Sequence, residues 1–187
     1  MLIMKKIHWF ISLWLIVVLS IAFTDLPRKA EGSDTWAKKE LYIKEDKASG
    51  TISIFRAGSK SPLLTQNAKA GFRPFLHPIT APDGKGVLTE YSPGHHKHQT
   101  GLYWGFTRVY GRDFFHNPGA AFWKRLAANV VDGKGEEVKW QTVYDLLNEE
   151  GNPILTETQN WSMREDGGKF LISLEWKGEA KTDITIG

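Results

Sequence analysis

Apolar and polar residues alternate with a period of two along most of the chain after residue 40. The pattern is clearest near the C-terminal end, where Phe170, Ile172, Leu174 and Trp176 occupy alternate positions. Successive side chains of a β-strand point to opposite faces of the sheet, so this spacing predicts a strand with one buried face.

The same period predicts further strands, and clusters of Gly, Pro, Asn and Asp mark the turns between them. Residues 120–129 are the one stretch expected to form a short helix. Antiparallel strands with one solvated face indicate an all-β protein built on an antiparallel meander. The strands are expected at residues 41–43 and 52–54 (a hairpin), 100–110, 138–146, 154–164, 170–177 and 182–186.

The N-terminal segment has a different pattern. Lys5 and Lys6 precede an almost unbroken apolar run over residues 7–24, and small residues at 20 and 22 suit a cleavage site. Residues 1–24 are therefore predicted to be a cleaved signal peptide or an uncleaved N-terminal membrane anchor. We expect an exported protein, periplasmic or extracellular, with membrane contact only through this segment if it is retained.

A polar linker over residues 25–38 and an all-β domain over residues 39–187 complete the expected organisation. The sequence stops inside the predicted strand at 182–186. A strand needs a neighbour or a protected edge. We therefore expect the domain to be truncated at its C-terminus.

Composition narrows the possible functions. The 187 residues include no cysteine, which excludes disulfides, thiolate metal sites and cysteine nucleophiles. The formal net charge of +3 falls to +1 without Lys5 and Lys6, and the remaining basic residues are scattered among acids. This charge pattern argues against a nucleic-acid partner and leaves a small molecule or glycan as the expected ligand.

Residues 73–123 contain five of the six histidines, together with many aromatic residues. If the strand begins at His96, then His96 and His98 point to the same side. Two imidazoles spaced in this way could bind a divalent metal such as zinc, act as general acid and base, or form a purely structural hydrogen-bonded cluster. The spacing alone does not decide among these three.

Two further motifs flank this pair. His77 lies between Pro74 and Pro78, which restrict the backbone around it and suit a side chain that must be aimed. Arg73 could bind a carboxylate or sugar hydroxyls, or could pair with an internal acid. Asp113 and His116 form a possible orienting pair.

The candidate site therefore has a polar centre and an aromatic surface. The catalytic candidates are His77, His96 and His98, with His96 and His98 also the candidate metal ligands. The candidates for substrate binding are Arg73, Tyr103, Trp104, Phe106, Asp113 and His116.

Three motifs in order, RPFLHPITAPDG (73–84), HKHQTGLYWGF (96–106) and VYGRDFF (109–115), resemble the DUF6807 proteins. This is a secreted bacterial family often labelled "methane oxygenase PmoA". The resemblance runs from about residue 41 to the end and implies a β-sandwich, supersandwich-like, often encoded among carbohydrate-degradation genes. The chain departs from the family pattern at His95, where members usually have an acidic residue, and at Gln99, where many have a second histidine.

The methane label fails as a function on physical grounds. A membrane subunit of a methane monooxygenase needs several spanning helices, and this chain has one apolar run approaching that length, in leader position. The resemblance and the histidines together suggest an enzyme acting on a carbohydrate or glycoside derivative. The alternative is a non-catalytic carbohydrate-binding or surface interaction module, which would depend on the aromatic residues instead.

Overall fold

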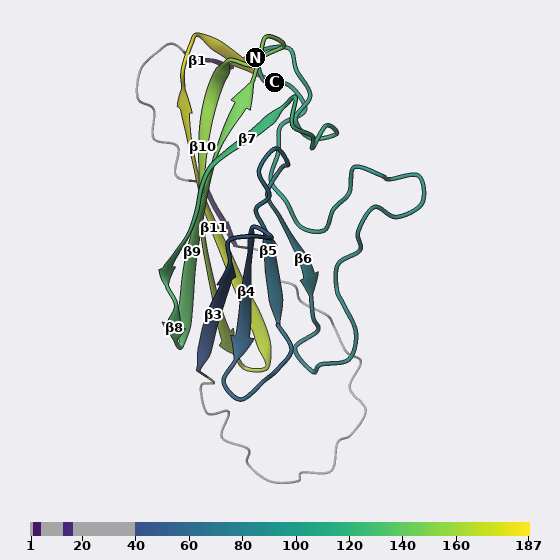
Figure 1. Cartoon of the computed structure of the whole chain (residues 1–187), viewed down its shortest axis with the longest axis vertical. Coiled ribbons are helices and arrows are strands. Elements are labelled where there is room, and N and C mark those ends of the chain that lie inside the picture. Colours follow the sequence, from purple (N-terminus) through teal and green to yellow (C-terminus); the bar gives the residue numbers. More distant parts are fainter. Residues whose placement is uncertain (1, 5–12, 17–39) are drawn as a thin grey trace.

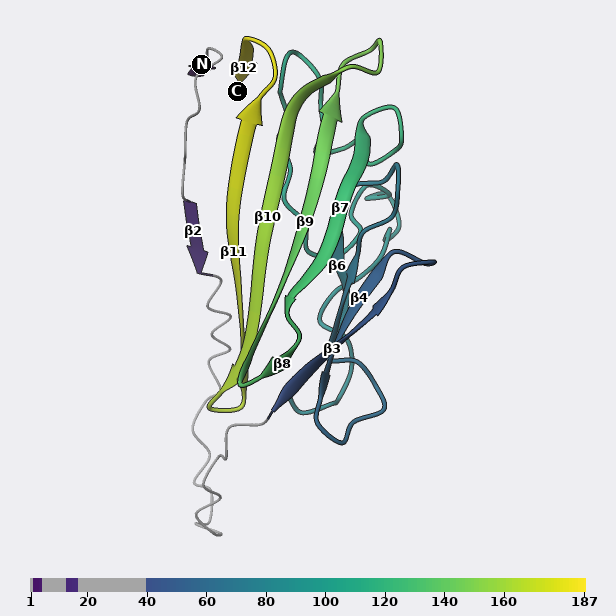
Figure 2. The same cartoon turned by 60° about the vertical axis from the view of Figure 1, so that its left-hand side comes forward.

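The computed structural model describes residues 2–4, 13–16 and 40–187. These residues form two five-stranded antiparallel sheets, seen as separate layers in Figure 2, and one isolated strand pair. The first sheet has the order β2 (Leu13–Ile16), β11 (Lys169–Ala180), β10 (Pro153–Asp166), β9 (Glu137–Leu147) and β7 (Trp123–Asp132). The second has the order β6 (Phe75–Ile79), β5 (Leu64–Asn67), β4 (Thr51–Arg56), β3 (Leu41–Asp46) and β8 (Lys134–Gly135). The isolated pair is β1 (Leu2–Met4) with β12 (Ile184–Ile186).

The meander β9–β10–β11 confirms the strands expected from the alternation. In its register Trp161 lies between Trp140 and Leu174. All three side chains are buried, so one face of the meander forms the floor of the core. The strand expected near the C-terminus is also present, as β12.

The β3–β4 hairpin confirms the other clear prediction, and its turn depends on a glycine. Gly50 has a φ of 69°, in the left-handed region. A Cβ atom there would lie 2.8 Å from the carbonyl oxygen of Ala68 and 2.8 Å from Nη1 of Arg125. The close approach of both groups therefore requires glycine at this position.

The core lies between the two sheets and draws apolar side chains from both. Polar bonds also cross the interface. The indole nitrogen of Trp140 donates to Oε1 of Gln66 at 3.0 Å, and the hydroxyl of Tyr144 donates to the carbonyl of Lys69 at 2.9 Å. The all-β sandwich predicted from the sequence is confirmed.

Two predicted elements are wrong. The helix expected over 120–129 is replaced by β7, whose pairing with β9 overrides the helix propensity of its Ala, Leu, Lys and Arg residues. The strand expected over 100–110 is absent, and only isolated bridges form at Leu102 and Val109. At Gly101 the backbone has a φ of 110°, a conformation that glycine favours, and a Cβ there would collide with the carbonyl of Leu76.

The predicted leader and linker fall mostly outside the described residues and stay predictions. Two short parts of the leader are described, as β1 and β2, and they pair with β12 and β11. In the described part of the chain, no helix is long and apolar enough to cross a membrane.

The connection between β6 and β7 runs through more than forty residues with little regular structure. In Figure 1 this teal segment lies on the side of the molecule away from β9, β10 and β11. It carries four of the five clustered histidines, while His77 lies on β6.

Candidate functional site

The first turn of the site contains His95, His96 and His98. The amide of His96 donates to the carbonyl of Pro93 at 2.8 Å, and that of Gln99 donates to the carbonyl of His96 at 3.0 Å. The backbone is therefore turned, and the expectation that His96 and His98 share one face of a strand is wrong. Their ring centroids are nevertheless only 5.9 Å apart.

The second turn is organised by Asp113. Its Oδ1 accepts hydrogen bonds from the amides of Phe115 and His116, each at 3.0 Å. Its Oδ2 lies 2.7 Å from Nδ1 of His116. With Nδ1 as the donor, the lone pair of the neutral imidazole is on Nε2, which points away from Asp113. The structure thus contains the Asp113–His116 pair suggested by the sequence.

The two turns bring His98 against His116, with ring centroids 4.5 Å apart and planes at 63°. The ring of Phe115 lies beside both imidazoles, at 5.8 Å from His98 and 5.0 Å from His116. We call His98, Asp113 and His116 the histidine pair site. Sequence spacing gave no reason to join His98 with His116 in particular.

The pKa values of His98 and Asp113 are both lowered, but for different reasons. Burial lowers the pKa of His98, and the neighbouring charges of His116, His96 and Arg73 act in the same direction. Burial opposes ionisation of Asp113, but its hydrogen bonds from His116 and Phe115 outweigh burial and lower its pKa. The site therefore favours a neutral imidazole at His98 and a carboxylate at Asp113.

Arg73 is turned inward, towards the backbone of the two turns. It is fully buried, and its Nη2 donates to the carbonyl of His98 at 2.7 Å while Nη1 donates to the carbonyl of Phe115. The guanidinium stacks on Tyr103, with Cζ 3.3 Å from the ring centroid. Burial lowers the pKa of Arg73 to about 10. Both residues were predicted to bind substrate, and the structure places them beneath the two turns.

The remaining predicted site residues lie elsewhere. Nδ1 of His77 is 2.9 Å from Oγ1 of Thr89, and among the described residues no hydrogen bond or ring contact joins His77 to His98. Burial lowers the pKa of His77. Trp104 and Phe106 are partly buried and pack against the core residue Trp176, which leaves little of either ring for a sugar.

Metal binding stays a prediction. Within residues 40–187, no three His, Asp or Glu side chains are grouped closely enough to hold a metal ion. The two-histidine zinc site predicted at His96 and His98 has fewer ligands than that grouping requires. Elemental analysis of untagged protein is the measurement that decides it.

Glu157 is a notable polar residue that sequence reasoning missed. It is completely buried on β10, where it accepts hydrogen bonds from the indole nitrogen of Trp176 at 3.0 Å and from Nε2 of Gln159 at 2.7 Å. Burial raises its pKa to about 7. The signal was available, because Glu157 occupies an inward position between Leu155 and Trp161 in the apolar alternation.

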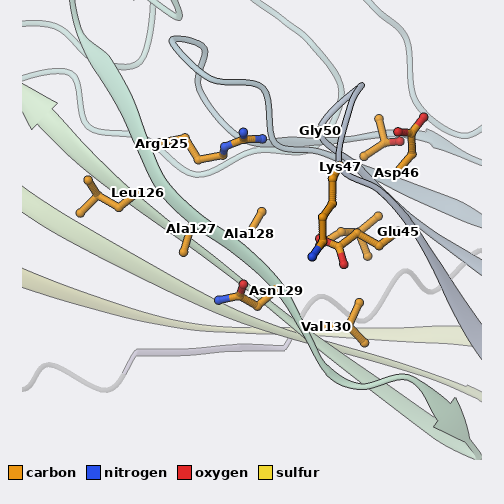
Figure 3. A pocket seen from close by; sticks show the side chains of 12 residues that line it. Glu45, Asp46, Lys47, Gly50, Arg125, Leu126, Ala127, Ala128, Asn129 and Val130 are labelled. Atoms are coloured by element: carbon orange, nitrogen blue, oxygen red, sulfur yellow. The ribbon is translucent and has the colours of Figure 1, made fainter.

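A cavity of about 400 Å³ lies between the β3–β4 turn and β7, and no histidine lines it (Figure 3). Its rim carries Lys47, Arg125 and Asn129. Arg125 is engaged by the carbonyl of Ala68 at 2.5 Å, and Asp46 by the amides of its own turn. The cavity is thus separate from the histidine pair site and lacks its titratable imidazoles.

A family model covers residues 55–187, most of the chain, and it describes the family of unknown function DUF6807. The chain therefore belongs to the DUF6807 family. No curated protein and no solved structure matches it.

Proposed function

We propose that this DUF6807 protein is an exported acid–base enzyme that acts on a carbohydrate or glycoside derivative. The observation that carries the proposal is the contact of His98 with His116, at 4.5 Å between ring centroids, while Asp113 holds His116 through Nδ1. An imidazole oriented by a carboxylate next to a second imidazole is a common arrangement for proton transfer.

The two imidazoles have different roles in this proposal. Nε2 of His116 accepts a proton from the substrate, and Asp113 stabilises the imidazolium that forms. His98, whose lowered pKa favours the neutral form, donates its ring N–H to the oxygen on which negative charge develops. His98 and Asp113 are thus used in the protonation states that their surroundings favour.

This pairing suits proton abstraction from a carbon beside a carbonyl. His116 takes the proton from carbon while His98 gives its ring proton to the carbonyl oxygen, which forms an enediol. The neighbouring hydroxyl then returns a proton to His98, and His116 reprotonates the adjacent carbon. No net proton is gained or lost, and no external oxidant is needed. The reaction class is therefore aldose–ketose isomerisation of a keto-sugar.

The surroundings support a sugar as substrate. The Phe115 ring lies against both imidazoles and offers an apolar face beside polar groups, as sugar-binding sites do. His96 is the next imidazole outward, and His95 lies beyond it at 4.1 Å between centroids. In this proposal His96 contacts the substrate at the rim, and His77 has no direct part in the reaction.

The test is deuterium exchange at carbon in D₂O, followed by NMR on a panel of keto-sugars with the full chain. We expect exchange with at least one member, falling about a hundredfold or more in His98→Ala and His116→Ala. Lys97→Ala, an exposed change in the same turn, is the matched control. Absence of exchange across the panel, or full exchange in both histidine variants, would exclude this chemistry.

A non-catalytic carbohydrate-binding module is the second candidate, and the position of Tyr91 favours it. This ring is 49% exposed and lies 5.8 Å from His77 and 5.7 Å from Phe75 between centroids. A glycan stacked there would lose affinity in Tyr91→Ala and keep it in His116→Ala. Calorimetry on both variants distinguishes the module from the enzyme, which predicts the opposite dependence.

A further inference from the structure

Arg73 places a positive charge inside the protein at an energetic cost. The side chain is fully buried, and in the described part of the chain no carboxylate lies within ion-pair distance of it. Its Nε has no hydrogen-bond partner. Burying a charge without a direct ion pair is expensive, and Glu157 and Asp113 offset this cost only through longer-range attraction, so the arrangement calls for a purpose other than stability.

The partners of Arg73 point to that purpose. Nη2 donates to the carbonyl of His98 at 2.7 Å and lies 3.4 Å from Oγ1 of Thr100, both in or next to the first turn. Nη1 donates to the carbonyls of Phe115 and, at 3.4 Å, Phe114 in the second turn. One guanidinium therefore joins the backbone that carries His98 to the backbone that carries His116.

The guanidinium is suited to this geometry and an ammonium group is not. Its planar fork presents two nitrogens at a fixed separation, whereas lysine offers a single donor centre on a flexible stem. The ring of Tyr103, 3.3 Å from Cζ, lies on one face of the fork and fixes its plane. The two turns are thus held at one spacing.

We propose that Arg73 is a positioning residue that sets the contact between the His98 and His116 imidazoles. The catalytic consequence rests on the proposed function, but the positioning itself does not. Arg73 is fully buried and donates to the backbone of both turns, so it acts through the histidines. Its charge also acts on His98, where it adds to burial, His116 and His96 in lowering the pKa.

The experiment compares Arg73→Lys with Arg125→Lys in the full chain. Arg125 also donates to a backbone carbonyl, that of Ala68, but lies by the cavity between the β3–β4 turn and β7. The structural readout is the nuclear Overhauser effect between the ring protons of His98 and His116. We expect this signal in the wild type and in Arg125→Lys, and its loss in Arg73→Lys.

Kinetics give the second readout. If the enzyme proposal holds, Arg73→Lys should lower kcat about a hundredfold, as expected for a displacement of about 1 Å, with KM nearly unchanged. If the wild type has no activity, the proposed function fails while the ring contact still tests the positioning. The two failures are therefore distinguishable.

A second variant covers the case in which Arg73→Lys does not fold. Tyr103→Leu removes the ring that fixes the guanidinium and leaves every hydrogen bond of Arg73 in place. It should weaken the His98–His116 signal by a smaller factor. If Arg73→Lys folds and its His98–His116 signal is undiminished, the inference is wrong. If Arg73→Lys does not fold, an undiminished signal in Tyr103→Leu overturns the inference instead.

Discussion

The β9–β10–β11 meander and the segment between β6 and β7 are held together by different interactions. The meander has continuous antiparallel ladders and one buried face, on which Trp140, Trp161 and Leu174 lie side by side. Its stability comes from apolar burial and repeated backbone hydrogen bonds. Each position of the meander therefore needs only an apolar or polar residue that keeps the alternation.

The irregular segment has few ladder bonds and depends on individual side chains. Arg73 and Asp113 fix the two histidine turns, and the indole nitrogen of Trp123 donates to the carbonyl of Asn117 at 2.9 Å. Arg112 donates to the carbonyl of Leu147, which ties the segment to β9. Such a segment can aim side chains that a regular strand would turn away, so we expect function here and stability in the meander.

The largest effect should come from the meander. Trp140 is fully buried, lies parallel to Trp161 at 6.3 Å and bonds to Gln66. Trp140→Ala should lower the free energy of unfolding by about 3–5 kcal/mol, measured by urea denaturation of the full chain. Leu126→Ala, at a position that is 50% exposed, should change it by less than about 0.5 kcal/mol. Equal losses would mean that burial on the inner face of the meander does not set its contribution to stability.

The fold of the meander could be predicted because its information is local. Alternation alone gave the strands now seen as β3, β4, β9, β10 and β11. The alternation rule failed over residues 100–110. The aromatic residues alternate there, but the backbone is turned and forms no strand. A different rule failed at 120–129, where local helix propensity was overridden by pairing with β9.

The site could be predicted only as far as its contacts are local. Asp113 and His116 are three residues apart, and their pairing was readable from the sequence. The contact between His98 and His116 requires Arg73 to bring two turns together, across 25 residues on one side and 42 on the other. No local pattern in a single sequence predicts that His98 and His116 come into contact.

Glu157 offers a pH test of the meander interior. Its pKa is raised to about 7 from an ordinary value of 4.5. Below pH 4.5 the carboxyl is protonated in both folded and unfolded chains, so its ionisation costs nothing. As pH rises towards 7 the unfolded chain ionises first, and the folded state loses roughly 3 kcal/mol of relative stability.

Glu157→Gln, which cannot ionise, should remove this loss. Its free energy of unfolding should exceed the wild-type value at pH 8 by more than at pH 5, as measured by urea denaturation. Glu175→Gln, an exposed position on β11, controls for the chemical change. If the free energy of unfolding differs between pH 5 and pH 8 by the same amount in the wild type and in Glu157→Gln, then another group causes the pH dependence.

Asp113→Asn tests the irregular segment, where function should change and stability should not. Asn keeps the Oδ1 acceptor for the amides of Phe115 and His116 but loses the negative charge beside Nδ1. We expect the deuterium exchange rate to fall about a hundredfold and the unfolding free energy to change by less than about 1 kcal/mol. Asp83→Asn, in an exposed turn where Oδ1 accepts from Lys85, should leave exchange unchanged.

The smallest effect should come from the ion pair that joins the two sheets. Arg56 on β4 donates to Oε1 of Glu165 on β10 through Nε at 3.0 Å and Nη2 at 2.7 Å. Because the pair is only partly shielded, with 26% and 12% of the two side chains exposed, a double-mutant cycle with alanine should give a coupling energy of about 1 kcal/mol. The coupling should weaken with added salt. The more exposed pair of Lys134 with Glu40 at 3.4 Å should show a smaller value, and equal values would mean that the partial burial of Arg56 and Glu165 does not strengthen their interaction.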